Sequence, residues 1–174
     1  MRTLITLAAL SVASVATASE PSMDAVLDSI DVVPTAAQLQ AAWPDAQQRL
    51  IAVANDSSET QWHRVRAASM LVQFPSEQTK TALFALATDE DAEVRRAAAH
   101  TAARTFGSEG GAELVTLLQG MLSDTDADVR SHVVRSLRWV DAPQAETVLR
   151  SIDTEELRSL ALRTLDRRAV RLAE

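Results

Sequence analysis

The sequence has 174 residues with a net charge of −7; 47% are hydrophobic, only 3% are aromatic, and there is no cysteine. Alanine supplies 31 residues and arginine outnumbers lysine sixteen to one, so the apolar side chains are small and favour helices over strands. This composition excludes disulfides, thiolate metal sites and cysteine nucleophiles. It also argues against a β-rich sandwich or barrel, and the length suits one core.

The N-terminus has the three parts of a secretory signal peptide. Arg2 precedes an apolar stretch from Leu4 to Val15, and Ala16-Thr17-Ala18 places small residues at a cleavage site. An apolar stretch of about 12 residues is too short to span a bilayer, which needs roughly 20. We therefore predict that residues 1–18 are a signal peptide cleaved after Ala18, and that the protein is exported, to a bacterial periplasm or, alternatively, by full secretion.

Residues 19–44 form an N-terminal segment interrupted by prolines. Short helices are predicted across Asp24 to Ile30 and Thr35 to Trp43, the second stopped by Pro44 because a residue before proline is pushed out of the helical region. Within it, Ser19 to Pro34 is predicted to be either a flexible tether or a cover that folds over the first repeat.

From residue 45 onward, a helical unit recurs four times. The copies begin at His63, Val94, Val129 and Leu157, and Arg follows the first position in each. The fifth, sixth and ninth positions are apolar and share one helical stripe, which should face the core; the residues there are Ala67, Ala68, Leu71, Ala98, Ala99, Ala102, Val133, Val134, Leu137, Ala161, Leu162 and Leu165.

Each copy follows another apolar helix that ends at an aspartate, so each is predicted to be the second helix of a hairpin. The hairpins are expected at about residues 45–74, 76–106, 110–140 and 142–168, within a repeat domain spanning 45–174. One hairpin cannot bury both of its apolar faces, so neighbours must stack. The predicted fold is all-α, a short right-handed α-solenoid of about four hairpins.

The pattern Asp-x-Asp-x-x-Val-Arg-x-x-Ala from Asp89 to Ala98, with a close copy from Asp124 to Val133, resembles HEAT-like repeats of the short class found in phycobilin lyases and bacterial scaffold proteins. The resemblance covers about residues 45–168. It implies a buried ladder in which the aspartates and arginines bond within and between repeats, formed here by Asp89, Arg95, Asp124 and Arg130.

The outer copies depart from this spacing. Asp56 lies eight residues before Arg64, and Asp153 lies five before Arg158, whereas the middle copies have a separation of six. The ladder is therefore expected only in the middle, with the terminal repeats acting as caps.

No motif predicts metal binding or catalysis. The three histidines, His63, His100 and His132, occupy different positions of the repeat, so they are not expected to share a column, and His63 is expected to be partly buried and structural. The acids of 89–93 and 124–128 lack the glycine of a calcium loop and are better explained as helix caps. Glu155 and Glu156 point apart, and no nucleophile elbow or phosphate loop is present. We predict a non-catalytic protein without a metal or cofactor.

A second set of positions carries basic side chains. The third, seventh, tenth and eleventh positions lie on the other side of each second helix from the core stripe, and the resemblance implies that second helices line a concave surface. An arginine ridge there, with Trp139 as an apolar anchor, would suit a binding face; it comprises Arg96, His100, Arg104, Arg135, Arg138, Trp139, Arg163 and Arg167. The alternative is a solvated face balanced by acids such as Asp166.

These features predict an exported scaffold or adaptor that holds a protein or peptide partner on its concave face, with the basic ridge favouring an acidic one. The alternative is an enzyme or accessory lyase acting on a small molecule or a chromophore-bearing protein, implied only by the occurrence of such repeats in lyases. After signal cleavage the chain carries 16 basic and 24 acidic side chains, which argues against nucleic acid as a partner. The sequence indicates neither the partner's identity nor the oligomeric state.

Overall fold

The computed structural model describes residues 22–29, 33–109 and 111–174, so the predicted signal peptide lies outside the described residues. All regular secondary structure in the described ranges is helical, which confirms the all-α prediction. The α-helices are α1 (Met23–Asp28), α2 (Ala36–Ala42), α3 (Ala46–Asn55), α4 (Gln61–Met70), α5 (Glu77–Leu86), α6 (Ala92–Phe106), α7 (Ala112–Met121), α8 (Ala127–Ser136), α9 (Pro143–Ser151) and α10 (Glu155–Ala173). Short 3-10 segments, η1 (Leu71–Gln73), η2 (Gly107–Glu109) and η3 (Leu137–Trp139), follow α4, α6 and α8.

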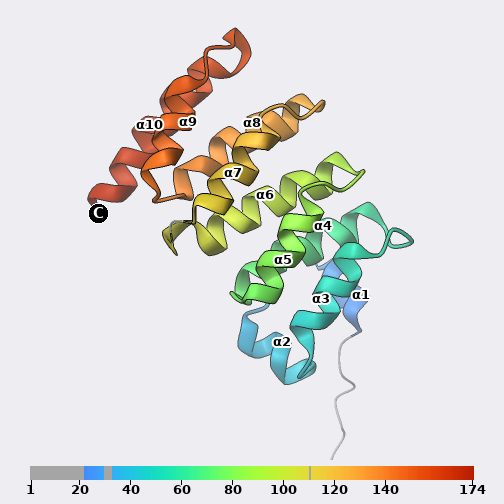
Figure 1. Ribbon diagram of the computed structural model, residues 1–174. Coiled ribbons are helices and arrows are strands. Elements are labelled where there is room, and N and C mark those ends of the chain that lie inside the picture. The colour runs from blue at the N-terminus through green and yellow to red at the C-terminus, as the bar shows by residue number, and fades with distance from the viewer. Residues whose placement is uncertain (1–21, 30–32, 110) are drawn as a thin grey trace, which may run out of the picture.

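Helices α3 to α10 form four successive hairpins that stack along the molecule as an α-solenoid (Figure 1). The second helices α4, α6, α8 and α10 contact one another extensively, whereas the first helices contact their neighbours much less, and α5 and α7 hardly touch. In a curved stack, the layer whose helices lie closer together is the inner one. The second helices therefore form the concave layer.

Small side chains explain why the second helices lie so close together. The core stripes of α4 and α6 are almost entirely alanine and are fully buried, and without larger side chains the helix backbones can approach closely. Leucines from the first helices, such as Leu50, Leu83 and Leu118, are also fully buried and fill the space between the two layers. The alanine excess of the sequence is thus located largely on the packed faces of the repeats.

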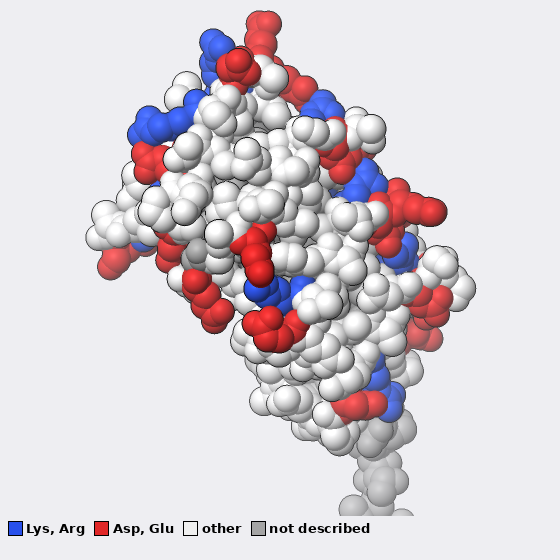
Figure 2. All heavy atoms as spheres, viewed as in Figure 1, with Lys and Arg blue, Asp and Glu red and all other residues white. Residues whose placement is uncertain are grey.

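The outer layer, formed by the first helices, differs in where its charged side chains lie. Figure 2 shows the face on which α5 and α7 lie toward the viewer: charged side chains gather along its edges and in one small central group, and the surface between them is largely uncharged. Between first helices, the described residues form a single ion pair, Lys80 with Glu113 at 2.6 Å.

At the N-terminal end, α1 covers the first hairpin. The Trp62 indole N–H donates to the carbonyl oxygen of Leu27 at 3.0 Å, and Arg66 donates to that of Ser29 at 2.6 Å. The ring of His63 lies between two carboxylates, with Nε2 at 2.9 Å from Asp28 and Nδ1 at 3.1 Å from Glu59. Residues 22–29 are therefore a packed cover and not a tether, and the partly buried His63 holds it to α4.

The C-terminal end is not covered in this way. Leu162 occupies the sixth position of its copy, as Ala68, Ala99 and Val134 do in theirs; those three are completely buried, yet Leu162 is 57% exposed. The expectation that this position faces the core in every copy is wrong for the last one, and so is the expectation that the last repeat acts as a cap. The reason is that no described helix packs on that side of α10.

Candidate functional site

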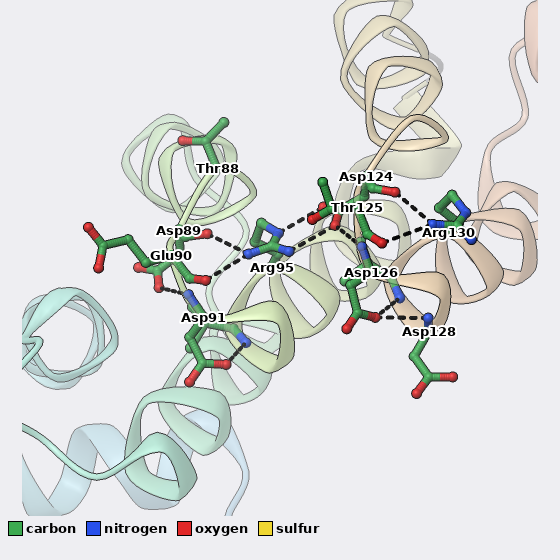
Figure 3. Close-up of polar contacts among 12 residues, drawn as sticks. Thr88, Asp89, Glu90, Asp91, Arg95, Asp124, Thr125, Asp126, Asp128 and Arg130 are labelled. Carbon is green, nitrogen blue, oxygen red and sulfur yellow. Dashed lines mark hydrogen bonds and ion pairs between the residues drawn. The ribbon is translucent and has the colours of Figure 1, made fainter.

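The turns within the hairpins carry a ladder of arginines and carboxylates (Figure 3). Arg95 donates to both carboxylate oxygens of Asp124, each at 2.8 Å, and also to the backbone oxygens of Asp89 and Glu90 at 2.8 and 2.9 Å. Each such arginine therefore ties the turn of its own repeat to an acid of the next repeat. Hydrogen bonding to Arg95 also holds the pKa of Asp124 below its usual value.

Arg130 repeats this arrangement one hairpin later. It donates to the backbone oxygens of Asp124 and Thr125 at 2.8 and 3.1 Å and to both oxygens of Glu156 at 2.9 and 3.0 Å. The acid at this interface belongs to the first turn of α10 and not to Asp153, the aspartate that ends α9 in the sequence pattern.

Two further turn acids, Asp91 and Asp126, cap the helices that follow them. Asp91 accepts the backbone N–H groups of Glu93 and Val94 at 2.8 and 3.4 Å, and Asp126 plays the same part at the start of α8. Every such acid satisfies backbone donors that have no partner inside the helix. Capping therefore accounts for Asp91 and Asp126, whereas Asp89, Asp124 and Glu93 pair with arginines.

The ladder also extends further than the sequence spacing predicted. Arg64 of the first copy forms an ion pair with Asp89 and donates to the carbonyl oxygen of Ala54 at 3.1 Å. The expectation of a ladder confined to the middle copies is wrong because the carboxylate comes from the following repeat, so the distance to Asp56 in the same repeat does not matter. Arg158 of the last copy donates to the backbone oxygen of Asp153 at 2.7 Å.

Five of the six arginines predicted for the ridge form no ion pair with any acid in the described ranges. These five are Arg104, Arg135, Arg138, Arg163 and Arg167. Arg96 is different, because it pairs with Glu93 one helical turn earlier. Asp166, the acid that the solvated-face alternative required, pairs with none of the five.

The structure brings several of these cations together around Trp139. The guanidinium carbons of Arg104 and Arg138 lie 4.5 and 4.6 Å from the centre of the Trp139 ring, within the range of a cation–π interaction. Burial lowers the pKa of Arg138, and the charges of Arg167 and Arg104 lower it further. Cations from three successive repeats therefore share one region, which we call the Trp139 cluster: Arg104, Arg138, Trp139 and Arg167.

A glycine in η2 positions Trp139. A β-carbon at Gly107 would lie 2.2 Å from the backbone oxygen of Trp139 and 2.8 Å from its carbonyl carbon, and the Asp141 N–H donates to the Gly107 oxygen at 2.9 Å. Only a residue without a side chain lets the end of α6 approach η3 this closely. Beside Trp139 lies an open groove of about 330 Å³, lined by Arg138, Trp139, Arg167, Val170, Arg171 and Glu174.

His100 and His132 meet edge to face next to this cluster, with ring centres 5.2 Å apart. The expectation that the histidines do not share a column is wrong for this pair, because the seventh position of one copy and the fourth position of the next lie on the sides of α6 and α8 that face each other. Burial is the main cause that lowers the pKa of each ring, to about 4 for His132. Both rings are therefore neutral at pH 7.

The described ranges contain no group of three or more His, Asp or Glu side chains arranged to hold a metal ion. Within the same ranges, no helix combines the length and apolar character needed to cross a membrane.

Comparison with known families agrees with this architecture. Residues 47–113 match HEAT repeats. The matched segment runs from α3 to the start of α7 and includes the first two hairpins, which confirms the resemblance seen in the sequence over these residues. HEAT repeats often mediate interactions between proteins and are generally non-catalytic. No curated protein matches the sequence.

Proposed function

We propose that this HEAT repeat protein is an exported, non-catalytic scaffold or adaptor that holds an acidic segment of a protein partner on its concave layer. The observation that carries the proposal is the group of five ridge arginines without an acidic partner in the described ranges. The whole sequence has 24 acidic and 17 basic residues, so acids are plentiful, yet none among the described residues pairs with these five arginines. Arginine is suited to such a role because its planar fork pairs bidentately with carboxylates.

The Trp139 cluster provides the centre of the proposed face. Arg138 is partly buried among other cations, so a carboxylate bound there would replace repulsion with attraction. The Nε–H of Arg138 and the indole N–H of Trp139 are buried without a hydrogen-bond partner among the described residues. A buried donor without a partner lowers stability, and a bound acceptor would remove this penalty. Tryptophan and arginine are also the side chains most enriched where binding energy concentrates.

The proposal is tested by measuring the binding of a peptide with matched charge-reversal variants. The probe is a short fluorescein-labelled peptide rich in Glu and Phe, compared with a peptide in which Lys replaces Glu, and binding is followed by fluorescence anisotropy. The double variant Arg135→Glu with Arg163→Glu should bind the acidic peptide roughly tenfold more weakly or worse, because two attractive charges become repulsive.

The control variant is Arg49→Glu with Arg150→Glu. It changes the net charge equally, but both arginines lie on first helices and pair with an acid four residues earlier. Helix content by circular dichroism should be the same in both variants. Equal loss of binding in the two variants, or undiminished binding in the first, would refute the proposed face.

The export part of the proposal is supported by the apolar stretch and the small residues ending at Ala18. The intact mass of protein recovered from the periplasmic fraction should correspond to a chain that begins at Ser19. A mass that retains residues 1–18 would contradict it.

A further inference from the structure

The outer side of the last hairpin has the register of an inter-repeat interface. In the first three copies, the sixth position of the second helix is buried against neighbouring repeats, whereas Leu162 is 57% exposed. Around it lies an open groove of about 350 Å³ lined by Leu149, Arg150, Ile152, Asp153, Arg158, Ala161, Leu162 and Leu165. This face of α10 therefore exposes the position through which α4, α6 and α8 pack against their neighbouring repeats.

The ladder of arginines and carboxylates is incomplete on the same face. Arg95 and Arg130 each bond a backbone oxygen of their own turn and a carboxylate of the next repeat. Arg158 makes the first of these bonds, to Asp153 at 2.7 Å, and within the described ranges it has no carboxylate.

One acid on this face is also without a partner. Asp166 is exposed and forms no ion pair in the described part of the chain, whereas Arg150 and Arg168 both pair with Glu146. Arg158 and Asp166 lie four residues before and four residues after Leu162, which puts all three on one ridge of α10. The unpaired charges are therefore opposite in sign and symmetric about an exposed leucine.

We propose that this face binds a second copy of the chain, with α10 packed antiparallel against α10 of that copy and Leu162 near the two-fold axis. In this arrangement Arg158 of each copy lies opposite Asp166 of the other, and both half-formed ladder positions are completed. A two-fold interface requires a self-complementary surface, which the sequence of cation, leucine and anion along α10 provides.

A head-to-tail arrangement fits less well. The start of the stack is covered by α1, which bonds to α4 through Leu27, Asp28 and Ser29. A second copy docking there would have to displace α1 before its own last hairpin could bind.

The face is large enough for a specific interface. Helix α10 has 19 residues, so it is roughly 28 Å long, and two adjacent helices are about 20 Å wide, which gives on the order of 560 Å² per copy. The total of about 1,100 Å² lies just above the roughly 1,000 Å² of a specific interface. Interfaces of this size are typical of weak or transient association, so the mass should be measured over a wide range of concentration.

The test is the mass in solution by sedimentation equilibrium. The wild-type chain should shift from monomer to dimer as its concentration rises, and Leu162→Glu should remain monomeric. The control is Val33→Glu, which lies between α1 and α2 at the opposite end of the stack and is 56% exposed; this variant should dimerise as wild type does. A wild-type monomer at every concentration, or a Leu162→Glu dimer, would overturn the proposal.

A charge swap tests the pairing itself. Arg158→Asp and Asp166→Arg should each weaken dimerisation roughly tenfold or more, and the double variant should recover most of that loss because the pairs re-form with exchanged signs. Absence of recovery would overturn the two-fold arrangement. Because no peptide is involved, these outcomes are independent of the proposed binding face on the concave layer.

Discussion

Two pairs in the ladder form a matched comparison of buried and exposed charge. Arg95–Asp124 and Arg130–Glu156 both join an arginine of one repeat to both carboxylate oxygens of an acid in the next, Arg95 through two of its nitrogens and Arg130 through Nη2 alone. The side chains of the first pair are 14% and 10% exposed, and those of the second are 22% and 49% exposed. Asp124→Asn and Glu156→Gln remove one negative charge from each pair while keeping its shape.

The two substitutions should lower the free energy of unfolding by different amounts. Breaking a buried pair costs about 3–5 kcal/mol, but Arg95 would keep two backbone acceptors, so we expect Asp124→Asn to lose about 2–3 kcal/mol. The asparagine can still accept the Asp126 N–H that Asp124 accepts at 2.9 Å, so the turn itself should survive. Glu156→Gln breaks a pair that is half exposed and should lose about 0–1 kcal/mol.

Urea unfolding at pH 7, followed by far-UV circular dichroism, measures both losses. Asp124→Asn should also lower the melting temperature by about 5–10 °C. The pKa of Asp124 is lowered in the folded state, so its contribution is present above the ordinary aspartate pKa and disappears as the pH falls through the lowered value. Equal losses for the two variants, or a loss below about 1 kcal/mol for Asp124→Asn, would refute the claim that burial sets the strength of each pair.

Further predictions concern backbone contact and pH. Gly107→Ala should cost about 1–3 kcal/mol and shift Trp139 fluorescence because the methyl group collides with the Trp139 backbone, whereas Gly120→Ala, with no atom within 4 Å, should be neutral or stabilising; urea midpoints check both. His132 has a pKa lowered to about 4, so stability should fall as the pH drops from 6.5 towards that value, and His132→Leu should flatten this slope. The pKa of His63 is raised, chiefly by its hydrogen bond to Asp28. His63→Gln should therefore lower the free energy of unfolding most at a pH below the ordinary histidine pKa, and the loss should shrink as the pH rises through the raised pKa of the folded state. Urea unfolding at several pH values measures this loss.

Local pattern was sufficient for the helices and, except at Leu162 in the last copy, for the faces that they bury. The recurrence at His63, Val94, Val129 and Leu157 predicted the hairpins, because the helical period alone determines which side chains share a stripe. The same pattern assigned alanines to the packed face and separated the arginines of the ladder from those of the ridge. Both assignments depend on residues within a single helix, where the geometry is known in advance.

Contacts between repeats could not be obtained in this way. Arg64 pairs with Asp89 of the following repeat, and Arg130 pairs with Glu156. The partner depends on how one hairpin stacks on the next and not on spacing within a hairpin. The same stacking brings His100 against His132 although they hold different positions of the repeat.

The sequence by itself determined the repeat, its helical faces and the residue types on each, since these follow from a period of 3.6 residues and from side-chain size. Only the tertiary structure decided which charges are neutralised. Arg96 and Arg104 look equivalent on the ridge, yet Glu93 neutralises the first, while the second lies over Trp139 without an acid among the described residues. Charge pairing depends on distances of a few ångströms between side chains far apart in sequence, and only the packing of successive hairpins sets those distances.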